Sequence, residues 1–226
     1  MNRKYPIGIQ SFENIRKEGY LYVDKTALIY QLVQTGKYYF LSRPRSIGKS
    51  LLLSTLQAYY EGKKELFDGL AMASLEKDWK TYPVLHLDLN AQRYDSVDSL
   101  TSILNDTLCE WERLYGTQES ETTLSLRFKG IIQRAAEKTG RNVVVLIDEY
   151  DKPMLQAIHN KELQSSYRNI LKAFYGVLKS KDAYLKFALL TGVTKLSKVS
   201  VFSDLNNIED ITLIRDFAGL CGISEE

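Results

Sequence analysis

The sequence contains little cysteine and little histidine. Its 226 residues include only two cysteines, Cys109 and Cys221, which lie far apart, and only two histidines. Without a Cys-x-x-Cys pair, this composition argues against a structural zinc site. Scarce cysteine is also typical of a reducing compartment, so we expect the protein to be cytoplasmic.

A long hydrophobic run is missing as well. The longest aliphatic run covers residues 143–147, far too short to span a bilayer, and no apolar segment follows the basic residues 1–4 to form a signal peptide. We therefore expect no membrane partner. A large excess of charge is missing too, since the net charge is only +2. Whole-chain charge thus gives no reason to expect nucleic-acid binding, although a local basic patch is compatible with it.

The sequence does have the composition of an ordinary globular protein that can bury a core, with 44% apolar and 26% charged residues. Stretches typical of strands alternate with stretches typical of helices, and no repeat, low-complexity linker or internal boundary interrupts them. This alternation predicts an α/β fold of three layers (α/β/α), in which a mainly parallel sheet lies between two layers of helices.

The expected elements follow from apolar periodicity and from the positions of glycine and proline. Strands are expected at 37–42, 83–90, 142–147 and 184–190, with a last short strand at 210–214. Helices are expected at 26–35, 49–60, 96–115, 124–139 and 163–179, with shorter ones around 75–80 and from Pro153. The strand at 83–90 alternates between apolar and polar side chains, which places it at an edge of the sheet.

A phosphate-binding motif follows the first strand. Residues 43–50 read Arg-Pro-Arg-Ser-Ile-Gly-Lys-Ser and lead directly into an apolar helix. In a P-loop of this kind, main-chain N–H groups and the helix N-terminus face an anion, Lys49 reaches the outer phosphates, and the Ser50 hydroxyl is offered to Mg²⁺.

The motif departs from the usual pattern at its start. Arg43 occupies the position of the usual first glycine, and Pro44 has no N–H to donate. We therefore expect the residues from Arg45 onward to build the phosphate cradle. The residues expected to bind the nucleotide are Arg43, Arg45, Ser46, Ile47, Gly48, Lys49, Ser50 and Leu51.

Two other strands end in residues that suit the same chemistry. Asp148 and Glu149 follow the buried strand at 142–147, and Thr191 follows the strand at 184–190. Ligands of open parallel sheets bind beyond the carboxyl ends of the strands, so these residues should meet the loop. Asp148 would hold Mg²⁺ together with Ser50. We expect catalytic roles for Glu149, which would activate the attacking water, for Thr191, which would contact that water or the γ-phosphate, and for Lys49.

Each assignment has a plainer alternative. The Gly-Lys-Ser triplet could be a mere helix start, and Asp148 and Glu149 could be surface caps. Glu149 could also be an acid that never acts as a base, as in a weak or inactive hydrolase, and Thr191 could simply end its strand. Arg43 and Arg45 could bind a neighbouring acid or a protein partner instead of phosphate.

Five motifs in this order resemble the bacterial AAA-ATPase-like family, and the resemblance covers essentially the whole chain. They are PIGIQSF at 6–12, YVDKT at 22–26, the loop at 43–50, DEYDKP at 148–153 and TGV at 191–193. The resemblance implies an additional-strand P-loop ATPase that uses ATP and Mg²⁺, with the Thr191 strand between the other two strands of the site. It also implies that Arg-Pro-Arg at the start of the loop is normal for the group.

Members of this family commonly carry a PD-(D/E)XK-type nuclease domain after the ATPase region. Here Ser46 and Ile47 replace a basic and an aromatic residue, and residues 220–226 stand where a helical lid would begin. Because neither a lid nor a nuclease motif is present, we do not transfer nuclease activity to this chain. We expect residues 1–226 to form one P-loop domain, with an N-terminal arm and helix at 1–36.

The sequence as a whole favours a slow ATPase that acts as a regulatory switch. An interaction module that keeps the fold without using nucleotide is the main alternative. A nucleic-acid-binding domain has only scattered Lys and Arg residues in its favour, so nucleic acid would be an indirect partner. The other candidate partners are a nuclease domain in a longer parent protein and a second copy of the chain. Lys195 and Lys198 follow the Thr191 strand and are the only other basic candidates that we expect near the site.

Overall fold

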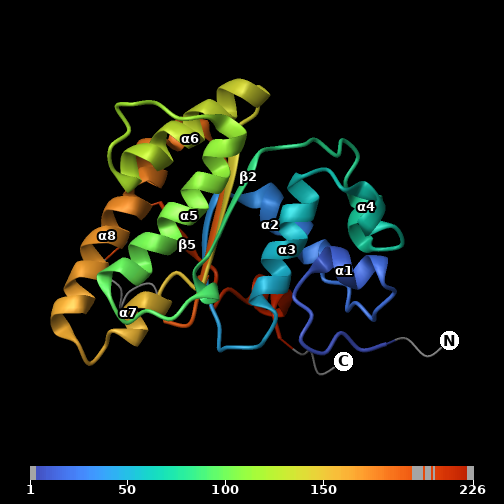
Figure 1. Cartoon of the computed structure of the whole chain (residues 1–226). Helices are drawn as coiled ribbons and strands as arrows, with labels where there is room; N and C mark the ends of the chain where they lie inside the picture. The colour runs from blue at the N-terminus through green and yellow to red at the C-terminus, as the bar shows by residue number, and fades with distance from the viewer. Residues whose placement is uncertain (1–3, 195–200, 202–204, 206, 223–226) are drawn as a thin grey trace.

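The computed structural model describes residues 4–194, 201, 205 and 207–222. Its centre is a five-stranded sheet in the order β2-β3-β4-β1-β5, in which each neighbouring pair is parallel (Figure 1). The strands are β1 (Tyr38–Ser42), β2 (Val84–Asp88), β3 (Val143–Asp148), β4 (Leu185–Gly192) and β5 (Glu209–Asp210). The strand that ends with Thr191, β4, lies between β1 and β3, as the family resemblance implies.

Helices cover both faces of this sheet (Figure 1). On one face lie α5 (Val97–Tyr115), α6 (Leu124–Thr139) and α8 (Lys161–Ser180), with the short α7 (Lys152–Gln156) beside them. On the other face lie α1 (Phe12–Lys17), α2 (Thr26–Thr35), α3 (Lys49–Tyr60) and α4 (Ala71–Leu75). Short 3₁₀ helices cover Lys64–Phe67, Leu89–Ala91, Asp182–Tyr184 and Arg215–Leu220. The predicted three-layer α/β fold is confirmed.

The interior strand β3 has no polar face over residues 143–147. Val143, Val145 and Ile147 belong to the apolar core under α5, α6 and α8, whereas Val144 and Leu146 belong to the core on the α3 side. A strand buried on both faces must be apolar at every position, which explains its continuous run of aliphatic side chains. By contrast, β2 alternates and has one neighbour, β3, so its predicted edge position is also confirmed.

The short helix expected at 75–80 was placed wrongly, because the helix in this region is α4, which ends at Leu75. The position is set by side chains distant in sequence: the Asp24 carboxylate accepts the Ala71 N–H at 2.7 Å, and the Thr26 hydroxyl accepts the Met72 N–H at 3.0 Å. These bonds satisfy donors that would otherwise be orphaned at the N-terminus of α4.

The strand expected at 210–214 is wrong in extent, since β5 covers only Glu209–Asp210. The chain turns away from the sheet because the Asp210 carboxylate accepts the N–H of Thr212 at 2.9 Å. The Thr212 hydroxyl in turn accepts the main-chain N–H of Ser42 at 2.9 Å. A side-chain acceptor thus takes the place of a strand partner at the end of β1.

Candidate functional site

The polar strand ends meet through one carboxylate. One oxygen of Asp148, at the end of β3, accepts a hydrogen bond from the Ser50 hydroxyl at 2.5 Å. Its other oxygen accepts a hydrogen bond from the Thr191 hydroxyl at 2.6 Å. Asp148 and Thr191 are both buried. This contact joins the start of α3 to the ends of β3 and β4, as the sequence predicts.

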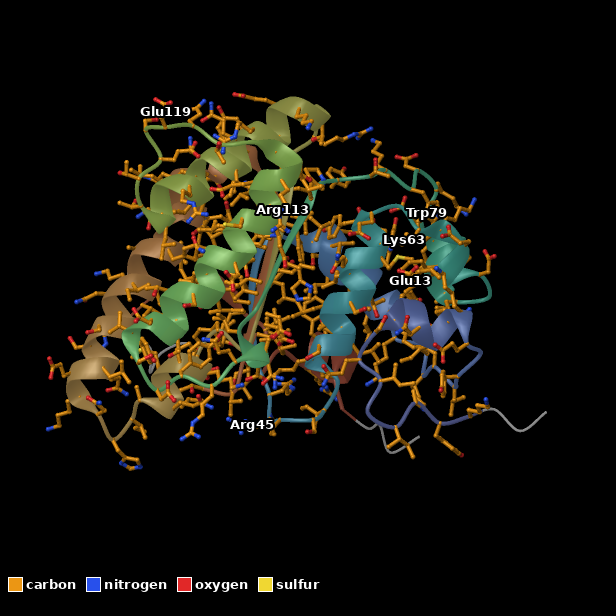
Figure 2. The ribbon with its side chains drawn as sticks, in the orientation of Figure 1. Glu13, Arg45, Lys63, Trp79, Arg113 and Glu119 are labelled. Carbon is orange, nitrogen blue, oxygen red and sulfur yellow. The ribbon has the colours of Figure 1, made fainter. Side chains whose placement is uncertain are left out.

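The loop between β1 and α3 has the conformation of an anion cradle. Gly48 is the N-cap of α3 with φ 94°, and Ser46 has φ 63°, so two loop residues adopt the left-handed region. Because Gly48 has no side chain to cap α3, the first N–H groups of the helix are available to an anion. Figure 2 shows Arg45 on this loop, at the opposite end of the molecule from Glu119.

Lys49 folds back over the loop. Its ammonium donates to the carbonyl oxygens of Arg43 and Pro44, both at 3.0 Å, and lies 3.2 Å from a carboxylate oxygen of Glu149. Only 4% of Lys49 is exposed. The carbonyl groups and the carboxylate therefore surround a buried positive charge at the place where an outer phosphate would be bound.

Glu149 has a strained backbone and a perturbed carboxyl group. Its φ is 55°, in a region that costs a residue with a side chain of this size about 1–3 kcal/mol. Burial raises the pKa of the Glu149 carboxyl above its ordinary value, and the nearby Lys49 ammonium opposes that rise without cancelling it. A carboxylate with a raised pKa is a better proton acceptor, which suits a general base.

The segment after Glu149 is bonded to the turn after β4. The Tyr150 N–H donates to the Thr191 carbonyl at 2.9 Å. The buried carboxylate of Asp151 accepts the N–H groups of Val193 at 3.1 Å and Thr194 at 2.5 Å. These bonds lie directly beyond Glu149, so they hold its strained backbone in place.

The loop and the strand ends border a cleft of about 530 Å³. Its lining comprises Pro6, Gly8, Ile9, Gln10, Arg45, Ser46, Gly48, Lys49, Ser50, Leu51, Asn90, Glu149, Lys152 and Gln156. The charged lining residues are the cations Arg45, Lys49 and Lys152 and the anion Glu149. The cleft therefore carries a net positive charge, which suits a polyphosphate.

Not every predicted site residue faces this cleft. The Arg43 guanidinium instead donates to the carbonyl oxygens of Ser42, at 3.2 Å, and Thr212. Ile47 lines a neighbouring apolar pocket, and the Thr191 hydroxyl is bonded to Asp148. Lys195 and Lys198 lie outside the described residues.

Several residues at the site were not assigned roles from the sequence. The cleft is also lined by residues of the arm at 6–10, Asn90, Gln156 and Lys152. Because Lys152 is basic, Lys195 and Lys198 are not the only other basic candidates near the site. The motif PIGIQSF contains the arm and the motif DEYDKP contains Lys152, so the sequence had marked both segments. What those motifs could not indicate was that the chain folds them against the loop.

The expectations about metals and membranes can be compared with the described residues. In the part of the chain that the structure describes, no group of three or more His, Cys, Asp or Glu residues could hold a metal ion. None of the helices built from described residues combines the length and the hydrophobicity needed to cross a bilayer.

Comparisons with known proteins support the assignment of the fold. The family model described as "AAA-ATPase_like: Predicted AAA-ATPase" matches residues 6–202. The chain is also 40% identical, over 225 residues, to an uncharacterized protein in the vnfD 5' region of Azotobacter chroococcum mcd 1. That match covers 99% of this chain and 43% of the relative, so the chain spans less than half of the relative's length. No solved structure matches.

Gly192 should be intolerant of any side chain. A Cβ there would lie 2.3 Å from a ring carbon of Tyr150 and 2.7 Å from a carboxylate oxygen of Asp151. We expect Gly192→Ala to lower the free energy of unfolding by roughly 1–3 kcal/mol, as overpacking does, in urea titrations followed by circular dichroism. Gly176→Ala is the matched control, because a Cβ there meets nothing within 4 Å and should be neutral or stabilising. Equal stability of the two variants would contradict the close approach at Gly192.

Proposed function

The chain belongs to the predicted AAA-ATPase family, and on that premise we propose that it binds ATP with Mg²⁺ and hydrolyses it slowly, as a regulatory switch. The observation that carries this proposal is the meeting of Lys49, Ser50, Asp148 and Glu149 beside the uncapped N-terminus of α3. Each of these residue types has a separate task in phosphoryl transfer. Lys49, Ser50 and Glu149 line one cleft, and the buried Asp148 is bonded to Ser50.

The phosphates of the nucleotide would lie against the start of α3, where N–H groups and the Lys49 ammonium supply positive potential. Ser50 and Asp148 fit a Mg²⁺ ion because both offer oxygen atoms, the ligands that Mg²⁺ prefers. The Ser50 hydroxyl donates its proton to Asp148 at 2.5 Å and keeps its oxygen lone pairs for the ion, and Asp148 would hold the ion through water. When bound there, the ion would neutralise part of the phosphate charge. We assign Thr191 the task of orienting Asp148 through the hydrogen bond between their side chains.

Glu149 would accept the proton of the attacking water. Its carboxylate lines the cleft, and its raised pKa suits a proton acceptor. In the structure, however, this carboxylate is paired with Lys49 at 3.2 Å. Phosphate oxygens compete with Glu149 for the same ammonium, so nucleotide binding would release the carboxylate. This exchange of partners gives the site two states, which is what a switch requires.

We expect hydrolysis to be slow in the isolated domain. The cleft cations Arg45, Lys49 and Lys152 would contact phosphate in the ground state as well as in the transition state, and such uniform binding does not speed chemistry. Fast phosphoryl transfer usually needs a further cation from a partner. Turnover should therefore lie well below the usual enzyme median of about 10 s⁻¹. For the partner we propose a nuclease domain in a longer parent protein, on the strength of the family resemblance alone.

Removing the Lys49 ammonium should weaken ATP binding. A charged hydrogen bond to phosphate is worth roughly 1.5–3 kcal/mol, so Lys49→Ala should raise the Kd of Mg-ATP at least tenfold in calorimetric titrations. Because the substitution leaves Glu149 buried without its ion pair, the double variant Lys49→Ala/Glu149→Gln should be measured beside it. Lys138→Ala, which removes a lysine bonded to the Leu114 carbonyl away from the cleft, is the control. Parental affinity in both Lys49 variants would refute the assignment.

Replacing Glu149 should separate hydrolysis from binding. Glu149→Gln should keep ATP affinity and lower turnover by about 10²–10⁴, the usual contribution of a general base. The deprotonated carboxylate is the active form, so parental turnover should fall as the pH drops through a midpoint above the ordinary value of 4.5. The variant should lose that acid limb. Turnover and pH dependence equal to those of the parent would remove Glu149 from catalysis.

A further inference from the structure

A second cavity adjoins the phosphate cleft. It has a volume of about 680 Å³ and shares Pro6, Ser46, Gly48 and Leu51 with the cleft, so the two cavities border the same part of the loop. Its other lining residues are mostly apolar: Tyr5, Ile15, Leu21, Tyr22, Val23, Lys25, Ile29, Ile47, Leu52, Thr55, Leu220, Cys221 and Gly222. We refer to it as the apolar pocket.

The chemistry of the two parts matches the two ends of a nucleotide. The cleft is cationic and contains the loop N–H groups, whereas the apolar pocket offers aliphatic and aromatic side chains such as Ile47, Leu51 and Tyr22. A flat aromatic base buries its faces favourably among such side chains. Because a purine presents more apolar area than a pyrimidine, it gains more from this pocket.

The outer wall of the apolar pocket comes from residues 220–222 and is held from two sides. The Gly222 N–H donates to the Ile47 carbonyl at 2.9 Å, which ties the wall to the loop. The Lys25 ammonium donates to the Gly222 carbonyl at 2.6 Å, which ties the wall to the start of α2. Both bonds are made by Gly222, and the two residues before it, Leu220 and Cys221, are buried. In the described part of the chain, Lys25 is thus the one side chain of the YVDKT motif that bonds to this wall.

We propose that the apolar pocket receives the purine base of the nucleotide and that Lys25 is the positioning residue that holds its wall in place. This inference rests on the proposed function, because it assumes that the phosphates occupy the adjoining cleft. It assigns Lys25 no contact with phosphate. A ligand with phosphates but no base should therefore not depend on Lys25.

Inorganic tripolyphosphate is the probe that isolates the base. In calorimetric titrations with Mg²⁺, the parent should bind ATP and GTP more tightly than CTP and all three more tightly than tripolyphosphate. Lys25→Met should raise the Kd of ATP about tenfold, the size expected for a lost charged hydrogen bond. The Kd of tripolyphosphate should stay within about twofold of the parental value. Lys25→Arg keeps a cationic donor and should recover most of the ATP affinity. Lys138→Met, which removes a matched lysine-to-carbonyl bond on α6, should change neither.

Retained tripolyphosphate affinity also shows that the Lys25→Met protein is folded. If that variant loses affinity for both ligands, the Ile47→Asn variant tests the base site instead. It places a polar amide in the apolar pocket while keeping Lys25, so it should lower the affinity for ATP but not for tripolyphosphate. Equal parental affinity for ATP and tripolyphosphate would overturn the base site but leave the phosphate site standing. Unchanged ATP affinity in Lys25→Met would overturn the role of Lys25. A parent that binds neither ligand would overturn the proposed function as well.

Discussion

The buried carboxylate of Asp148 is the contact on which the rest of the site depends. A buried charge is costly unless hydrogen bonds compensate it, and here the hydroxyls of Ser50 and Thr191 donate to its two oxygens at 2.5 and 2.6 Å. Those two donors belong to α3 and β4, so satisfying one charge fixes the helix start and two strand ends against each other. The phosphate-binding loop can take its cradle shape because its far end is anchored in this way.

The ion pair between Lys49 and Glu149 is better explained by function than by stability. Buried ion pairs often contribute little net stability, because desolvation offsets their attraction. The backbone of Glu149 also has a φ of 55°, held by the bonds of Tyr150 and Asp151 on its C-terminal side. The backbone of Glu149 is strained, and Lys49 could pair with a phosphate in place of Glu149. The pair is therefore suited to the exchange of partners that we propose for nucleotide binding.

Much of the fold and the centre of the site could be predicted because their signals are local. Strand β3 is a run of β-branched and aliphatic residues, the Gly-Lys-Ser triplet marks the loop, and Thr191 is the residue before the last one of β4. The parts that could not be predicted depend on contacts across the sequence. Lys25 meets a carbonyl 197 residues away, and the position of α4 is set by a carboxylate 47 residues before it. No periodicity within a short window carries that information.

The central claim is that this cleft binds a nucleotide with its cation, and a calorimetric titration of the parent chain with ATP, with and without Mg²⁺, tests it most directly. We propose that Ser50 and Asp148 hold the cation and that Lys49 and the N-terminus of α3 hold the phosphates. We therefore expect saturable binding of one ATP per chain that is tighter with Mg²⁺ than without it. An absence of binding under both conditions would contradict the account, and binding that is indifferent to Mg²⁺ would contradict the assignment of the cation site.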